Sequence, residues 1–248
     1  MTARPSILET HALTRSFGGV IAVDNLDFQL HEGELRCLIG PNGAGKSTFF
    51  KMLCGQLKPS AGRIALRGVD ITGADPHDIA RRGVGIKTQV PNLFDGLSVR
   101  ENLRLAARRH AGEREAARIV DEMLARIRMQ SRASRCAGEL AHGERQWVEL
   151  GMVLAGNPQL VLLDEPTAGM TKDEVAATAE LLRTLRGERA LIVVEHDMHF
   201  VKMIAERVTV LHQGRVLMNA HVDDVMRDES VRDIYLGKHA GAALAAKP

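Results

Sequence analysis

The stretch GPNGAGKST, residues 40–48, decides the fold. It matches the pattern GxxxxGK[ST], follows a short apolar run from Leu35 to Ile39, and precedes residues 49–54, which predict a helix ended by Gly55. The order strand, glycine loop, helix brings backbone N–H groups and a helix N-terminus to one point, where the charge of a triphosphate is favoured. A purely structural glycine turn is disfavoured because it does not explain this context.

The side chains of this phosphate loop (residues 40–48) have distinct expected roles. Lys46 would neutralise the β- and γ-phosphates, the Ser47 hydroxyl would bind Mg²⁺, and Thr48 adds a donor near the α-phosphate. The predicted ATP-binding residues of the loop are Asn42, Gly43, Ala44, Gly45, Lys46, Ser47 and Thr48.

A second chemical signal is the run Leu160 to Leu163 followed by Asp164 and Glu165. In a parallel sheet this strand end lies at the same edge as the phosphate loop. We expect Asp164 to hold Mg²⁺ and, since side chains alternate along a strand, Glu165 to point away from it and activate the attacking water. Taken alone, two acids after a strand indicate a solvated strand end; the phosphate loop reverses that preference.

The rest of the chain predicts an α/β fold of the P-loop NTPase class. Leu26, Phe28 and Leu30 alternate with polar residues, which indicates an antiparallel sheet near the start. Apolar runs that alternate with helices predict a parallel-sheet core, and a hairpin is expected around Gln213-Gly214. Capping pairs predict helices that begin after Ser98 and Thr171.

These patterns predict how the chain is divided. Residues 1–89 and 156–236 would form an ATP-binding core with an antiparallel β subdomain, residues 90–155 an inserted helical subdomain, and residues 237–248 a flexible tail.

Composition argues against several other classes of protein. The 248 residues include 33 basic and 31 acidic side chains, so the net charge of +2 offers no field for nucleic acid. Three cysteines without a CxxC pair predict neither a disulfide framework nor a zinc site. Because no membrane span or secretion signal is recognisable, we expect a cytosolic protein whose membrane partner supplies the spans.

The order of these motifs resembles that of ABC ATPase domains, over residues 6 to 236. The resemblance rests on the phosphate loop, Gln89, the Asp164-Glu165 strand end, His196, and a signature segment that comprises Leu140, Ala141, His142, Gly143 and Glu144. It implies that two ATP molecules are sandwiched in a dimer and that the signature segment acts in trans on the partner's nucleotide. A helix expected from Glu144 to Ala155 would direct its positive end at the γ-phosphate.

The same resemblance implies roles for single residues. Gln89 would sense Mg²⁺ and link hydrolysis to the membrane partner, His196 would contact the γ-phosphate, and Phe17 would stack on adenine with Val23 beside it. Without the family, Gln89 is a loop glutamine, His196 a strand-end histidine, and Phe17 a core residue.

This chain departs from the family pattern at two positions. Ala141 replaces a serine whose hydroxyl would reach the partner's γ-phosphate, which removes one hydrogen bond worth about 0.5 to 1.5 kcal/mol. Thr171 stands where the segment 168–171, the D-loop, has aspartate. Neither change touches Lys46, Asp164 or Glu165.

Within the family, several phrases resemble the importers of branched-chain amino acids, urea and short amides, with the urea type nearest for GELRC, AGMT and EHDM. That resemblance implies permease subunits, a second related ATPase or a homodimer partner, and indirectly a periplasmic solute-binding protein, with this subunit on the inner face of the membrane. The alternatives are an ATPase of envelope lipid or lipopolysaccharide export, a soluble ABC ATPase, and a scaffold that binds ATP without cleaving it. The groove beside Gln89 and the helical insert, residues 90 to 130, would distinguish them, because it would receive the permease's coupling helix.

Overall fold

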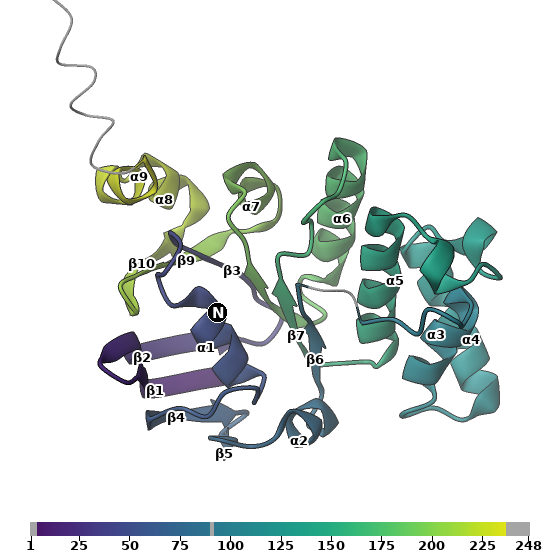
Figure 1. Cartoon of the computed structure of the whole chain (residues 1–248), viewed down its shortest axis with the longest axis horizontal. Coiled ribbons are helices and arrows are strands. Elements are labelled where there is room, and N and C mark those ends of the chain that lie inside the picture. Colours follow the sequence, from purple (N-terminus) through teal and green to yellow (C-terminus); the bar gives the residue numbers. More distant parts are fainter. Residues whose placement is uncertain (1–3, 90–91, 237–248) are drawn as a thin grey trace, which may run out of the picture. The chain divides into compact units, whose positions relative to one another are not determined.

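A computed structural model describes residues 4–89 and 92–236, and the chain divides into two compact units. The first unit consists of residues 1–31, 35–75 and 194–248, and the second of residues 32–34 and 76–193 (Figure 1). The expected flexible tail, residues 237–248, lies outside the described residues. The expected subdomain boundaries stay a prediction.

The first unit contains most of the strands. Its elements are β1 (Ser6–Phe17), β2 (Val20–His31), β3 (Leu35–Ile39), α1 (Lys46–Leu53), β4 (Ala61–Leu66), β5 (Val69–Asp70), α7 (Met198–Ile204), β9 (Arg207–His212), β10 (Arg215–His221), α8 (Val222–Arg227) and α9 (Glu229–Leu236).

The second unit contains the longest helices. Its elements are α2 (Pro76–Arg81), β6 (Val84–Lys87), α3 (Val99–Ala107), α4 (Glu113–Arg126), the 3₁₀ turns η1 (Gln130–Arg132) and η2 (Ala137–Glu139), α5 (His142–Ala155), β7 (Leu160–Asp164), α6 (Lys172–Leu185) and β8 (Ala190–Val194), which belongs to this unit up to Val193.

An antiparallel sheet of order β2-β1-β4-β5 occupies one side of the first unit. Leu30 pairs with Leu8 and Phe28 with Thr10, and Leu26, Phe28 and Leu30 are buried while the residues between them are not. The prediction of an antiparallel sheet near the start is therefore confirmed, and its period-two burial follows from the pleat.

Strand β3 leads into the phosphate loop and pairs with β9 in parallel, with Ile39 opposite Val210. β9 and β10 form the predicted antiparallel hairpin. Its two turn residues, Gln213 (φ 49°) and Gly214 (φ 78°), both have left-handed backbone angles, the geometry that a two-residue type I′ hairpin requires.

In the second unit, β6 pairs with β7 in parallel, with Lys87 opposite Leu163, and β8 is the next strand beside β7. Helix α3 packs against α4 and α5. The predicted caps are both present: Ser98 accepts from the Glu101 N–H and Thr171 from the Glu174 N–H. The predicted parallel-sheet α/β class is confirmed.

Two helices begin earlier than the sequence predicts. α1 begins at Lys46 instead of Phe49, because the Phe49 N–H already donates to Gly45 O at 2.9 Å. α5 begins at His142 instead of Glu144, because the Arg145 N–H donates to Ala141 O at 3.0 Å. His142, Gly143 and Glu144 of the signature segment therefore form the first turn of α5, while Ala141 is its N-cap and Leu140 precedes it.

Within residues 4–89 and 92–236, no helix is both long enough and apolar enough to cross a bilayer.

The turn residue Gly214 provides a test of how the hairpin supports the phosphate loop. A Cβ on Gly214 would lie 2.9 Å from Ala22 O, whereas a Cβ on Gly68, at φ 76° in the β4–β5 turn, would meet no atom within 4 Å. Gly68→Ala should cost only the left-handed strain, about 1–2 kcal/mol. We expect Gly214→Ala to lower the free energy of unfolding by more than that, measured by urea denaturation, and to weaken ATP binding as well. Equal losses in the two variants would contradict the contact.

Candidate functional site

The phosphate loop is closed from within by its own lysine. Lys46 Nζ donates to Gly40 O at 2.6 Å and to Pro41 O at 3.0 Å, and the Ala44 N–H donates to Pro41 O at 3.2 Å. Loop carbonyls therefore turn toward the ammonium group, which holds a positive charge in the loop where a phosphate would bind.

The β9–β10 hairpin supports the loop from outside. The Gly214 N–H donates to Ala44 O at 3.0 Å, and the Asp24 N–H donates to Gly214 O at 2.9 Å. A Cβ on Gly45 would lie 2.4 Å from Ala22 O and 3.4 Å from a methyl of Val23. Val23 is 0% exposed, so any effect of this residue on a nucleotide acts through the loop that it supports.

The outer face of the loop is open. Asn42, Gly43 and Ser47 are exposed, and a Cβ on Gly43 would meet no atom within 4 Å. The N-terminus of α1 begins at Lys46 without a side-chain cap and adds a partial positive charge at this face. The arrangement fits a polyphosphate, and the Ser47 hydroxyl fits the preference of Mg²⁺ for oxygen ligands.

His196 lies in the first unit, two residues after the end of β8. The Glu195 N–H donates to Leu38 O at 3.2 Å, in the strand that enters the phosphate loop, and the His196 N–H donates to Glu195 Oε2 at 3.1 Å. The His196 side chain is exposed. The segment that ends at Glu195 therefore runs beside β3. His196 follows the first of these neighbouring segments, and the phosphate loop follows the second.

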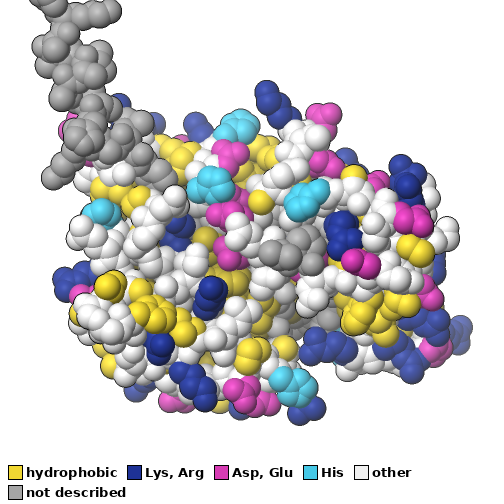
Figure 2. All heavy atoms as spheres, in the orientation of Figure 1, with side chains coloured by type: hydrophobic (Ala, Val, Ile, Leu, Met, Phe, Trp, Pro, Cys, Tyr) yellow, Lys and Arg dark blue, Asp and Glu magenta, His cyan; other side chains and the backbone are white. Residues whose placement is uncertain are grey.

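Phe17 is an exposed platform and not a core residue. It is 47% exposed at the β1–β2 turn, where Val20 and Ile21 are exposed as well, and Figure 2 shows hydrophobic side chains gathered there. The Arg15 guanidinium carbon lies 4.6 Å from the centre of the Phe17 ring. An open aromatic face of this kind suits stacking on a planar base.

In the second unit the structure brings Gln89 and Glu165 together. Gln89 Nε2 donates to Glu165 Oε2 at 2.9 Å, and Asp164 is the last residue of β7. Glu165 has φ 45°, a left-handed conformation that costs a non-glycine residue free energy and is concentrated at functional sites. Strand alternation predicts the direction of the Glu165 side chain only for an extended residue, so the left-handed turn sets that direction instead.

The signature segment contacts the D-loop of its own chain. Ala141 is the N-cap of α5, and its N–H donates to Glu144 Oε2 at 3.1 Å, but its methyl group cannot accept a bond in return. His142 Nε2 lies 3.1 Å from Ala168 O and 3.2 Å from Gln146 Nε2. Thr171 caps α6, which preserves the capping role that aspartate would have at this position.

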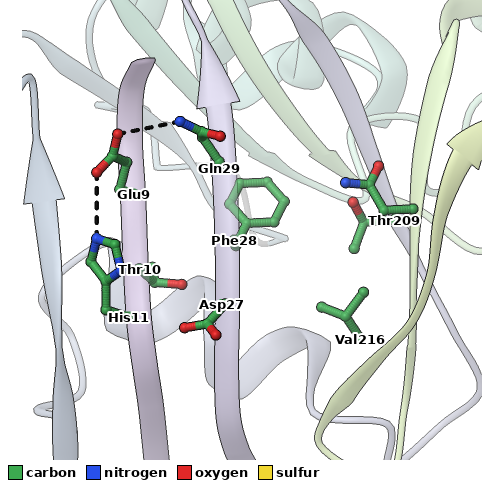
Figure 3. Close-up of a pocket in the computed structure, with 9 residues that line it drawn as sticks. Glu9, Thr10, His11, Asp27, Phe28, Gln29, Thr209 and Val216 are labelled. Atoms are coloured by element: carbon green, nitrogen blue, oxygen red, sulfur yellow. Dashed lines mark hydrogen bonds and ion pairs between the residues drawn. The ribbon is translucent and has the colours of Figure 1, made fainter.

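A hollow of about 460 Å³ beside β1, β2, β9 and β10 is a separate feature (Figure 3). Polar side chains, among them Glu9, His11, Asp27 and Gln29, line it around the Phe28 ring. None of the predicted site residues belongs to its lining, so it is not the candidate site.

Comparison with known proteins agrees with this geometry. Residues 23–168 match the profile of the ABC transporter family, which is more than half of the chain. The chain belongs to the ABC transporter family. It is an ABC ATPase, as the motif order indicated, and the resemblance stated from sequence is confirmed.

Relatives within the ABC transporter family match over almost the whole chain. The high-affinity branched-chain amino acid transport ATP-binding protein BraF of Pseudomonas aeruginosa is 35% identical, over 95% of this chain and 99% of its own. The lipopolysaccharide export system ATP-binding protein LptB of Acidithiobacillus ferridurans is 32% identical, over 93% of this chain and 97% of its own.

Solved ABC structures have the same fold. An ATP-binding cassette of an ABC transporter in its ADP conformation is 26% identical, with a TM-score of 0.82 over 94% of this chain and 99% of that one. A dimeric post-hydrolysis cassette bound to ADP and Pi is 25% identical, with a TM-score of 0.77 over 87% of this chain and 98% of that one.

Two features near the site were not predicted from the sequence. The pair Lys87 and Glu149 is buried beside Gln89, although a lysine at the end of the apolar run Val84 to Lys87 was a detectable signal. The Arg15 contact with Phe17 was also missed, although residues two apart on a strand share a face.

Ala141 provides a test of the incomplete cap on α5. Ala141→Ser supplies the missing acceptor, so we expect the free energy of unfolding to rise by about 0.5–2 kcal/mol in urea denaturation. Ala141→Val, which adds bulk without an acceptor, is the matched control and should give no gain. A rise with valine, or none with serine, would contradict the cap.

Proposed function

We propose that this ABC ATPase hydrolyses ATP to drive solute uptake through a separate transmembrane permease. The observation that supports the chemistry most strongly is the open phosphate loop, with Lys46 held inside it and the N-terminus of α1 directed at its mouth. The relation to BraF over nearly the whole chain supports the importer.

The side chains divide the reaction among them. Lys46 and the N–H groups of residues 42–48 would bind the phosphates. Ser47, Gln89 and Asp164 would hold Mg²⁺, which would neutralise phosphate charge. Glu165 orients and deprotonates the attacking water, and His196 contacts the γ-phosphate. Phe17 stacks on adenine.

A dimer completes the site. Residues 140–144 of a second ATPase, either a copy of this chain or a related subunit, contact the γ-phosphate in trans through the N-terminus of α5. The dimeric state of a related cassette bound to ADP and Pi supports this arrangement.

The permease would bind an apolar groove of about 430 Å³ in the second unit. Phe94 and Leu105 are 57% and 46% exposed there, and Arg109 lies at its rim. Figure 2 shows hydrophobic side chains gathered over α3 next to basic ones. The groove fits a short helix with an apolar face and a carboxylate, which supports a coupling helix as its ligand and a position of the subunit on the inner face of the membrane.

Branched-chain amino acids are the favoured solutes, with urea and short amides as the other members of the group, and a periplasmic binding protein would deliver them. The relation to LptB supports a second candidate function, ATP-driven export of envelope lipid. The catalytic residues are the same in both, so the permease decides between them.

Glu165→Gln tests the chemistry. Loss of a general base should lower the rate of ATP hydrolysis by roughly a hundredfold or more, while the dissociation constant for ATP remains unchanged. Glu188→Gln, an exposed acid elsewhere in the second unit, should hydrolyse ATP normally. Near-normal turnover by Glu165→Gln would refute its role.

The groove and the permease are tested by co-purification of the tagged chain from native membranes in mild detergent. Two permease subunits of an amino acid or amide importer should come along in stoichiometric amounts. Leu105→Asp should abolish this, whereas Leu217→Asp, at a residue 42% exposed on β10, should not. Envelope-lipid components, or no membrane protein, would overturn the importer assignment.

A further inference from the structure

A buried ion pair lies beside the residue that contacts Glu165. Lys87, the last residue of β6, and Glu149, in the middle of α5, approach to 3.3 Å between Nζ and Oε2. Their side chains are only 1% and 6% exposed. Both residues belong to the second unit, as do Gln89 and Glu165.

Stability alone does not account for this pair. Removing two charges from water costs free energy that their attraction often only balances, and apolar replacements of similar volume are commonly as stable. Burial raises the pKa of the Glu149 carboxyl, while Lys87 and the Asn92 N–H favour its charged form.

The pair contacts the described backbone on both sides of Gln89, at Thr88 and at Asn92. On one side, Lys87 Nζ also donates to Thr88 O at 3.2 Å. On the other, Glu149 Oε1 accepts from the Asn92 N–H at 2.9 Å. Between these two attachments the Gln89 side chain donates to Glu165.

The same pair connects this segment to two further surfaces. Glu149 lies on α5, which begins with the signature residue His142, and both Glu149 and Asn92 line the groove proposed for the permease. One ion pair thus touches the groove, the Gln89 segment and the signature helix.

We infer that Lys87 and Glu149 are positioning residues for ATP hydrolysis. They hold Gln89 against Glu165 and attach that contact to α5, so that occupancy of the groove changes the geometry at Glu165. This inference rests on the proposed function. It adds residues to the mechanism that do not touch the nucleotide.

The test separates positioning from folding by comparing single and double variants. Glu149→Gln retains an acceptor for the Asn92 N–H but removes the carboxylate charge beside Lys87, so the Tm should fall. Lys87→Met with Glu149→Leu removes both charges and should restore the Tm. The double variant should nevertheless show a kcat on the order of 10- to 100-fold lower, because the attachment of the Gln89 segment is lost. The KM for ATP should be unchanged. Glu180→Gln, in the exposed pair with Arg128, is the control.

A second measurement asks whether the effect runs through Gln89. Gln89→Ala should lower kcat in the wild-type background and have much less effect in the double variant, because coupled residues are not additive. If the double variant recovers both Tm and kcat, the pair is only structural and the inference fails. If neither the wild-type protein nor its complex with the permease hydrolyses ATP, the proposed function is overturned instead.

Discussion

The phosphate loop depends on one constraint: its N–H groups can face an anion only if its carbonyls are held by other hydrogen-bond donors, one within the loop and one outside it. Lys46 Nζ binds the carbonyls of Gly40 and Pro41, and the Gly214 N–H binds that of Ala44. The loop therefore has its conformation before a ligand arrives. Preorganisation of this kind is what makes electrostatic stabilisation effective, because little reorganisation is needed when charge develops.

The second unit organises its residues in the same manner, through contacts distant in sequence. Glu165 occupies a left-handed turn directly after β7, and the amide of Gln89 holds its carboxylate. The segment that carries Gln89 is in turn attached to α5 through Lys87 and Glu149. The residues that line the groove and those that contact Glu165 thus share a short chain of polar contacts, buried at Lys87 and Glu149 and exposed at Gln89, which supplies a physical route for the proposed coupling.

Much of this arrangement could be predicted from the sequence because its signals are local. The glycine loop, the strand ending at Asp164, the Gln213-Gly214 turn and the caps at Ser98 and Thr171 each depend on a few adjacent residues. The features that could not be predicted depend on distant contacts or on single torsion angles. Val23 is buried close to Gly45, and Glu165 has a positive φ. The Lys87–Glu149 pair joins a strand to a helix.

The measurement that tests the account most directly is a structure of the Glu165→Gln protein with ATP and Mg²⁺, together with its partner ATPase if it pairs with one. The account predicts a triphosphate over residues 43–48, Mg²⁺ beside Ser47 and Asp164, and residues 141–144 of the second ATPase against the γ-phosphate. A nucleotide bound elsewhere, such as in the hollow of Figure 3, or one bound without a second signature segment, would contradict it.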